Sequence, residues 1–248
     1  MKGSGELGCR AVLFDLDGVL VRSGTVVERS WTERARDRGL EPARVLASRH
    51  GRRSVEVVAE VAAHPDAAAG AAHLEARQAA DADGLTRCRG AHAVPAALSG
   101  GAWAVVTPGT RALAHAGPRG TGLPVPDVLA TADDVASGKS APDGCPAASR
   151  ALGVPPAERV GVADALPGVT AAPAAGMPVT GVRGPALGPG EAPARAVGAV
   201  GGLAPRLRAG RVVLPGGARR PRRVPPNGGP NVSHGPAHPS RTRTEEAS

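Results

Sequence analysis

The chain has 248 residues, a length that accommodates a core domain with a smaller insert but not three compact domains. Hydrophobic residues make up 42% of the chain and aromatic residues only 1%, so any core must be built from Ala, Val and Leu. The net charge of +8 lies entirely in residues 183–248, where 11 Arg face three Glu, and the neutral remainder argues against a basic, nucleic-acid-binding core.

The first predicted element is a short buried strand over residues 10–14, followed directly by Asp-Leu-Asp-Gly at 15–18. An amphipathic helix is predicted over residues 25–40, because apolar side chains recur there at every fourth position. Further helical stretches are expected over residues 54–63 and, with weaker periodicity, over 64–84.

Four more buried strands are predicted later in the chain, at residues 103–107, 125–130, 160–164 and 178–182. Strands that alternate with helical intervals indicate an α/β fold with a doubly wound parallel sheet. The helical residues 23–90 would then be inserted after the first strand.

Residues 183–248 break this pattern, because they are dense in Gly, Pro and Arg. Such a segment buries too little apolar surface to offset the entropy of ordering it, so we expect a disordered basic tail. Truncation after Val182 is accordingly expected to leave the stability of the core unchanged.

Asp15 and Asp17 form the sharpest chemical feature of the sequence. Two carboxylates placed two residues apart just past a strand, with Gly18 permitting a tight turn, provide one oxygen for attack and a second group for proton transfer. The same pattern also occurs in calcium-binding loops and in ordinary turns, so by itself it leaves these alternatives open.

Lys139 and Lys2 are the only lysines among 30 basic residues, and Lys139 alone lies in the interior of the chain. A compact ammonium group neutralises a carboxylate and a phosphoryl oxygen together, which the planar guanidinium of Arg does not reproduce. Thr107 ends the 103–107 strand and Gly109 follows it, so a hydroxyl and backbone N–H groups there suit phosphate. Asp164 ends another strand and suits a hard cation. The alternatives are a solvated surface side chain for Lys139, an ordinary turn at 107–110 and a helix cap for Asp164.

Together these residues match, in chain order, the four motifs of the haloacid dehalogenase superfamily. The corresponding segments are VLFDLDGVLVRS (12–23), AVVTPGT (104–110), GKSAPD (138–143) and GVADALPGV (161–169). Residues 123–135 and 174–182 also resemble the subgroup of sugar-phosphate phosphatases, glycerol-phosphate phosphatases and beta-phosphoglucomutase. The resemblance covers residues 10–182.

The resemblance implies a role for each motif residue. Asp15 would be the nucleophile that forms an aspartyl-phosphate, and Asp17 the general acid and base. Thr107, Gly109 and Lys139 would bind the phosphoryl group. The carboxylates of Asp15 and Asp164 and the backbone carbonyl of Asp17 would hold Mg²⁺.

The same resemblance divides the chain into a core at residues 1–22 and 91–182, a helical cap domain at 23–90 and the tail at 183–248. Within the cap, His50, Gly51, Arg52 and Arg53 resemble a loop that reaches the substrate. A solvated helix start is the alternative for this loop.

Several positions depart from the family pattern. Ala163 replaces a Glu that usually precedes the last Asp, which removes one carboxylate near the metal. Pro108 removes a backbone N–H at the phosphate, Ser140 stands where Pro is usual, and Arg22 stands where an acidic residue is common. Prolines also fall inside expected helices, at positions 146 and 173.

The leading hypothesis is a Mg²⁺-dependent phosphatase acting on a small phosphorylated metabolite such as a sugar or polyol phosphate. A sugar phosphomutase is the nearest alternative, and a catalytically silent relative with a polyanion-binding tail is another. Three scattered cysteines suggest neither disulfides nor zinc, and no signal peptide or membrane span is apparent, so a cytoplasmic location without membrane partners is expected. Nucleic-acid binding is not favoured, because the tail has no aromatic residue for base stacking. The oligomeric state is left open.

Overall fold

A computed structural model describes residues 6–61, 66–98, 101–188, 190–208 and 210–214 of the protein. Its centre is a six-stranded sheet in the order β6-β5-β2-β7-β8-β9, and every neighbouring pair is parallel. The strands are β2 (Ala11–Phe14), β5 (Trp103–Val106), β6 (Leu129–Ala130), β7 (Arg159–Ala163), β8 (Val179–Val182) and β9 (Ala196–Val197). The predicted α/β fold with a parallel sheet is confirmed.

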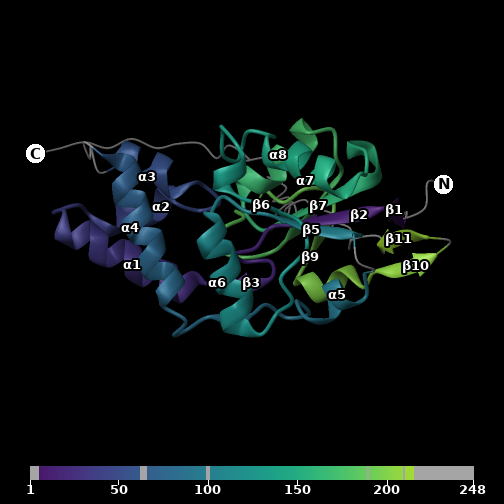
Figure 1. Cartoon of the computed structure of the whole chain (residues 1–248), viewed down its shortest axis with the longest axis horizontal. Coiled ribbons are helices and arrows are strands. Elements are labelled where there is room, and N and C mark those ends of the chain that lie inside the picture. The colour runs from purple at the N-terminus through teal and green to yellow at the C-terminus, as the bar shows by residue number, and fades with distance from the viewer. Residues whose placement is uncertain (1–5, 62–65, 99–100, 189, 209, 215–248) are drawn as a thin grey trace, which may run out of the picture.

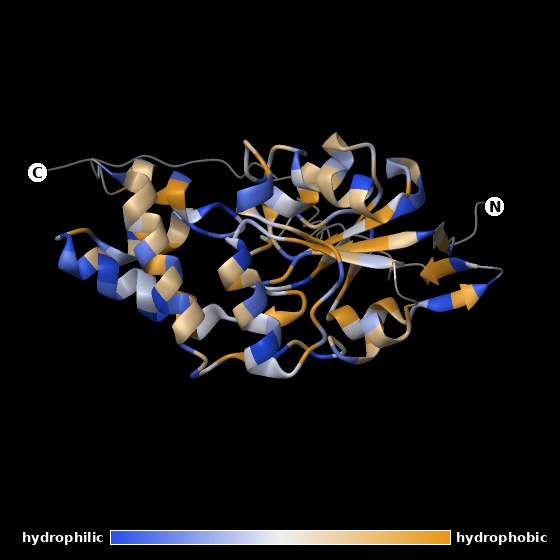
Figure 2. Cartoon of the chain, in the orientation of Figure 1, coloured by the Kyte–Doolittle hydropathy of each residue, from blue (hydrophilic) through white to orange (hydrophobic). Residues whose placement is uncertain are grey.

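Helices cover both faces of this sheet (Figure 1). They are α5 (Ala93–Ala96) and α6 (Arg111–Thr121) on one face, and α7 (Gly144–Leu152) and α8 (Leu166–Ala174) on the other. Along β2, Val12 and Phe14 pack toward the first face while Leu13 packs toward the second, as the period of two in a strand requires. Figure 2 shows hydrophobic residues concentrated in the central strands between the two helical layers.

Four helices between β3 (Val21–Arg22) and β4 (Thr86–Arg87) form a separate bundle to one side of the sheet (Figure 1). They are α1 (Gly24–Asp37), α2 (Pro42–Ser48), α3 (Ser54–Val61) and α4 (Ala67–Ala80). The antiparallel pair β3–β4 joins the bundle to the core. Trp31, Val57, Val58 and Leu74 are buried at its centre, so the bundle has a small core of its own.

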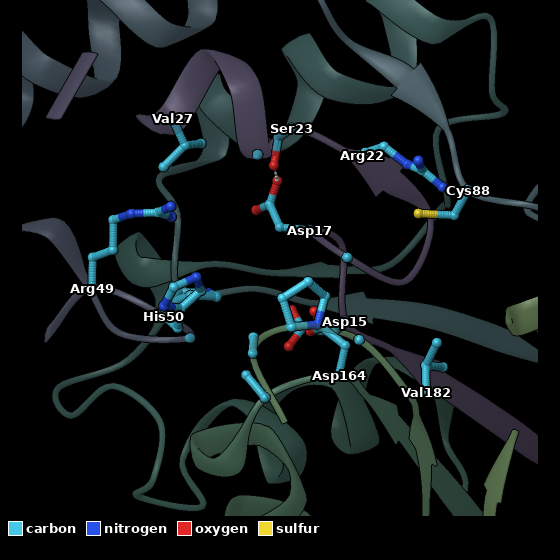
Figure 3. A pocket seen from close by; sticks show the side chains of 18 of the residues that line it. Asp15, Asp17, Arg22, Ser23, Val27, Arg49, His50, Cys88, Asp164 and Val182 are labelled. Carbon is cyan, nitrogen blue, oxygen red and sulfur yellow. Dashed lines mark hydrogen bonds between the residues drawn. The ribbon is translucent and has the colours of Figure 1, made fainter. Parts of the chain in front are cut away.

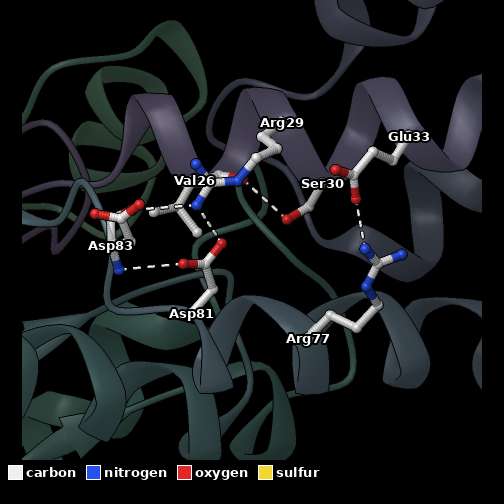
Figure 4. Close-up of polar contacts among 7 residues, drawn as sticks. All are labelled: Val26, Arg29, Ser30, Glu33, Arg77, Asp81 and Asp83. Carbon is white, nitrogen blue, oxygen red and sulfur yellow. Dashed lines mark hydrogen bonds and ion pairs between the residues drawn. The ribbon is translucent and has the colours of Figure 1, made fainter.

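Ion pairs tie the first and last helices of the bundle together. Arg29 on α1 contacts Asp81 just past α4, and Arg77 on α4 contacts Glu33 on α1 (Figure 4). These side chains are partly exposed, so each pair contributes at most about 1 kcal/mol. The apolar interior is therefore the main source of stability of the bundle.

The prediction of a disordered tail from residue 183 onward is wrong for the described residues up to Leu214. This segment supplies β9, a 3₁₀ turn (Val200–Leu203), β10 (Arg206–Arg208) and β11 (Arg211–Leu214), and β11 pairs antiparallel with β1 (Leu7–Cys9). Val200, Leu203, Val212 and Leu214 of this segment are buried in the main core. Gly, Pro and Arg dominate its composition, but a few well-spaced apolar residues suffice to anchor it. Residues 215–248 lie outside the described part.

Smaller differences from the predicted elements have local causes. The strand expected at 125–130 is reduced to β6, because Pro124 and Pro126 remove backbone donors. Pro146 lies in the first turn of α7, where no intrahelical N–H is needed, and Pro173 lies in the last turn of α8. Within the described residues, no helix is both long and apolar enough to cross a membrane.

Candidate active site

Three carboxyl groups meet at the carboxyl ends of two adjacent parallel strands. Asp15 follows β2, Asp17 lies two residues further on, and Asp164 follows β7, which pairs directly with β2. Gly18 adopts a φ of +71°, and a Cβ at this position would overlap the Asp164 carboxyl group. Glycine is therefore required for the close approach of the two strand ends.

Lys139 contacts the first of these carboxylates. Its Nζ lies 2.7 Å from Asp15 Oδ2 and donates a second hydrogen bond, of 2.8 Å, to the carbonyl of Val106 at the end of β5. The side chains of Lys139 and Asp15 are only 10% and 5% exposed. The backbone N–H of Leu16 donates to Asp15 Oδ1 at 2.9 Å, so both carboxylate oxygens are fixed by hydrogen bonds. This geometry rules out a freely solvated lysine.

The crowding of negative charge shifts the protonation of this cluster. Burial, together with repulsion from Asp15 and Asp17, raises the pKa of Asp164 to about 7, against an opposing effect of Lys139. Burial also raises the pKa of Asp17, although a hydrogen bond from the Ser23 hydroxyl acts in the opposite direction (Figure 3). A single ammonium group thus faces three neighbouring carboxyls, and a further cation would relieve their repulsion.

The donor atoms at this edge are oxygens, which suits a hard cation such as Mg²⁺. The described residues contain no group of three His, Cys, Asp or Glu side chains placed to hold a metal ion. The set of metal ligands implied by the family resemblance contains only two carboxylates and one backbone carbonyl. Mg²⁺ commonly completes its coordination shell with water. The cluster of Asp15, Asp17 and Asp164 is therefore compatible with this ion.

The loop after β5 lies beside the carboxylates, but two of its backbone N–H groups already donate hydrogen bonds within the protein. The N–H of Gly109 donates to Thr107 Oγ1 at 3.2 Å, and the N–H of Thr110 donates to Glu75 Oε2 at 3.0 Å. Pro108 has no N–H to offer. Gly109 lines the cavity described next, whereas Thr107 is buried beside it.

A cavity of about 710 Å³ opens over the carboxylates, between the sheet edge and the four-helix bundle (Figure 3). Asp15, Asp17 and Asp164 line its floor. His50, Gly51 and Arg52, which were predicted to reach the substrate, also line it. Burial and the neighbouring Arg49 guanidinium lower the pKa of His50, which favours the neutral imidazole.

Arg53, the fourth residue of the predicted substrate loop, is not part of the cavity lining. Its guanidinium instead donates to the carbonyl of Ala136 at 2.8 Å. Its side chain packs closely against Gly138, and the N–H of Gly138 donates to Glu56 Oε1 at 3.3 Å. Arg53 and Glu56 thus connect the bundle to the loop that carries Lys139.

A second contact joins the bundle to the loop that carries Asp164. Gly51 has a φ of +70°, and a Cβ there would lie 3.2 Å from side-chain atoms of both Ala165 and Pro167. The bundle therefore contacts both the loop that carries Lys139 and the loop that carries Asp164.

The sequence patterns missed several cavity residues. Arg49 lines the cavity, and its buried Nε has no hydrogen-bond partner among the described residues. Glu75 and Gln78 reach the cavity from α4, and residues 183–186 and 198–200 form part of its wall. Arg49 directly precedes the predicted loop at 50–53, so the sequence could have indicated it as a cavity residue. The contribution of the later segments depends on the packing of the C-terminal strands.

Comparisons with known proteins agree with this geometry. A model of haloacid dehalogenase-like hydrolases matches residues 9–176, and the chain belongs to this family. It is 40% identical over 183 residues to hexitol phosphatase A of Escherichia coli (strain K12), a match covering 72% of this chain and 85% of that protein. It is 29% identical over 195 residues to glycerol-1-phosphate phosphohydrolase 2 of Saccharomyces cerevisiae, covering 71% and 76% of the two chains.

Among solved structures, CbbY from Rhodobacter sphaeroides in complex with xylulose-(1,5)bisphosphate superposes with a TM-score of 0.65 at 25% identity, covering 79% of this chain and 96% of that one. The resemblance to sugar-phosphatase-like members of the superfamily is thereby confirmed. Within its family, the chain is a hydrolase of phosphoric monoesters.

Proposed function

We propose that the protein is a Mg²⁺-dependent phosphatase that hydrolyses a small sugar or polyol phosphate through an aspartyl-phosphate at Asp15. The observation that carries this proposal is the buried contact of 2.7 Å between Asp15 and Lys139 at the floor of the cavity. The names of the hexitol and glycerol phosphatases support a polyhydroxylated leaving group.

In the first step, a carboxylate oxygen of Asp15 attacks phosphorus while the bond from phosphorus to the leaving oxygen breaks. Asp17 donates a proton to that leaving oxygen, and its raised pKa, caused by burial, favours the protonated acid that this role requires. In the second step, Asp17 takes a proton from the water that attacks the aspartyl-phosphate. Inorganic phosphate leaves and the Asp15 carboxylate is restored.

Lys139 keeps Asp15 in position and offsets negative charge as the phosphoryl group approaches. Thr107 and Gly109 would contact the phosphoryl oxygens after a change in the hydrogen bond that now joins them. Mg²⁺, held by the carboxylates of Asp15 and Asp164 and by the carbonyl of Asp17, would add positive charge at the phosphoryl oxygens.

The four-helix bundle within residues 23–90 would act as a cap that excludes water during the first step. His50, Gly51 and Arg52 would face the bound substrate from this cap. Arg53 would instead help to hold the cap closed through its hydrogen bond to Ala136.

Phosphate release by the purified full chain, measured on a panel of sugar and polyol phosphates with and without Mg²⁺, tests the proposal. We expect Mg²⁺-dependent release from at least one polyol phosphate. Isomerised sugar phosphate without phosphate release would favour a phosphomutase. Inactivity on the whole panel would favour a catalytically silent relative, in which Ala163 stands where the family pattern has a Glu.

A further inference from the structure

Helix α4 carries two buried polar side chains on the face that meets the cavity. Glu75 and Gln78 are three residues apart, so they lie on the same side of the helix. Their exposed fractions are 5% and 3%, and both line the cavity. The other buried residues of α4 are Gly70, Ala71 and Leu74, so this polar pair is a local exception on an otherwise apolar buried face.

The two side chains differ in their hydrogen bonds. Glu75 Oε2 accepts the N–H of Thr110, which fixes α4 against the loop that begins at Thr107. The buried Nε2 of Gln78 has no partner among the described residues. A buried donor without a partner is costly, so an amide at this place is best explained by a ligand that completes its hydrogen bonds.

The position of the pair indicates which part of a substrate it meets. The phosphoryl group belongs beside Asp15 and Lys139 on the core side of the cavity, whereas Glu75 and Gln78 reach the cavity from α4 in the bundle. The pair therefore faces the leaving group. A hydroxyl both donates and accepts, so it can donate to the Glu75 carboxylate and accept from the Gln78 amide.

We infer that Glu75 and Gln78 determine specificity by binding hydroxyl groups on the carbon chain of the leaving group. This inference rests on the proposed phosphatase function and makes it more specific. The substrates it selects are phosphate esters of polyhydroxylated chains, as opposed to aryl or simple alkyl phosphates.

The test compares glucitol 6-phosphate, which is rich in hydroxyls, with p-nitrophenyl phosphate, which has none on its leaving group. Gln78→Met keeps the length of the side chain but removes both polar ends. We expect its KM for glucitol 6-phosphate to rise about tenfold with little change in kcat, and its kcat/KM for p-nitrophenyl phosphate to stay within about twofold of wild type. Glu75→Gln should show the same selectivity with a smaller effect.

Thermal unfolding separates this role from a structural one. Because Met replaces an unpaired buried amide, Gln78→Met should melt at or above the wild-type temperature while binding the polyol phosphate less tightly. His73→Leu, an exposed change on the same helix, is the matched control and should alter neither quantity.

Equal losses on the two substrates, or no loss on glucitol 6-phosphate, would overturn the inference and leave the phosphatase proposal intact. If neither substrate released phosphate, the wider substrate panel would decide the phosphatase proposal. Calorimetric binding of glucitol 6-phosphate in the presence of Mg²⁺ would then decide the inference by itself. Weaker binding to Gln78→Met than to wild type would support it, and equal binding would overturn it.

Discussion

Removal of the chain after Val182 should unfold the protein. The cut deletes β9 and the β10–β11 hairpin, and with them the strand that pairs with β1. Four side chains in the deleted part are almost completely buried in the main core. They are Val200, Leu203, Val212 and Leu214, with exposed fractions of 0%, 1%, 1% and 2%.

The size of the loss follows from this burial. Each fully buried Val or Leu contributes about 1.5–3 kcal/mol, so the four together contribute about 6–12 kcal/mol. A domain of this kind is stable by only about 5–15 kcal/mol. The truncated chain would also expose the side chains that these four now cover, so little or no net stability would remain.

Circular dichroism melts of three proteins test this estimate: the full chain, a chain ending at Leu214 and a chain ending at Val182. The chain ending at Leu214 keeps every core residue named above and should melt like the full chain. The chain ending at Val182 should show no cooperative transition. A cooperative melt of that chain at the temperature of the full chain would refute the assignment of these residues to the core.

Three substitutions probe the carboxylate cluster. Asp15→Asn should lower phosphate release at least about 10³-fold, because an amide is a far poorer nucleophile than a carboxylate. Its circular dichroism spectrum should stay that of the folded protein. Wild-type turnover would disprove the assignment of Asp15 as the nucleophile. Lys139→Met should lower kcat about 10²-fold or more in the same assay, since it removes the cation 2.7 Å from Asp15; an unchanged kcat would show that this contact has no catalytic part. An ideal Cβ on Gly168 would lie 2.6 Å from Ala163 Cβ and 3.3 Å from Asp15 Oδ2, so Ala163 and Asp15 both adjoin Gly168. Ala163→Glu should therefore lower the Mg²⁺ concentration for half-maximal activity about tenfold, and identical Mg²⁺ titrations of mutant and wild type would contradict the proposed metal position.

The elements that carry the carboxylates were predictable from the sequence, because their signals are local. A run of buried residues such as 11–14, ended by Asp15, specifies a strand that delivers a side chain to the sheet edge. The pairing of β2 with β7, which the structure shows, then brings Asp15 and Asp164 together. The lysine was recognisable because the sequence almost never uses that residue.

The parts that were missed depend on contacts between distant segments. The burial of Val212 requires β11 to pair with β1, some 200 residues earlier in the chain, and no local composition indicates this pairing. Gln78 lies in an alanine-rich stretch with weak periodicity, so the face that meets the cavity could not be identified before α4 was placed against α6. The sequence assigned Arg53 to the substrate together with Arg52. The structure shows that Arg53 instead binds the carbonyl of Ala136, a contact that the sequence does not indicate.

The central claim, a covalent phosphoryl intermediate on Asp15, is open to direct measurement. The protein is mixed with an excess of a polyol phosphate and Mg²⁺, quenched in acid and digested in acid with pepsin, because an aspartyl-phosphate hydrolyses at the alkaline pH that trypsin needs. The peptide that contains both Asp15 and Asp17 is then isolated. Fragmentation in a mass spectrometer distinguishes Asp15 from Asp17 within this peptide. We expect the phosphoryl group on Asp15 and an unmodified Asp17 in the wild-type protein. Continued turnover with an unmodified Asp15, or with the phosphoryl group on another residue, would contradict the mechanism.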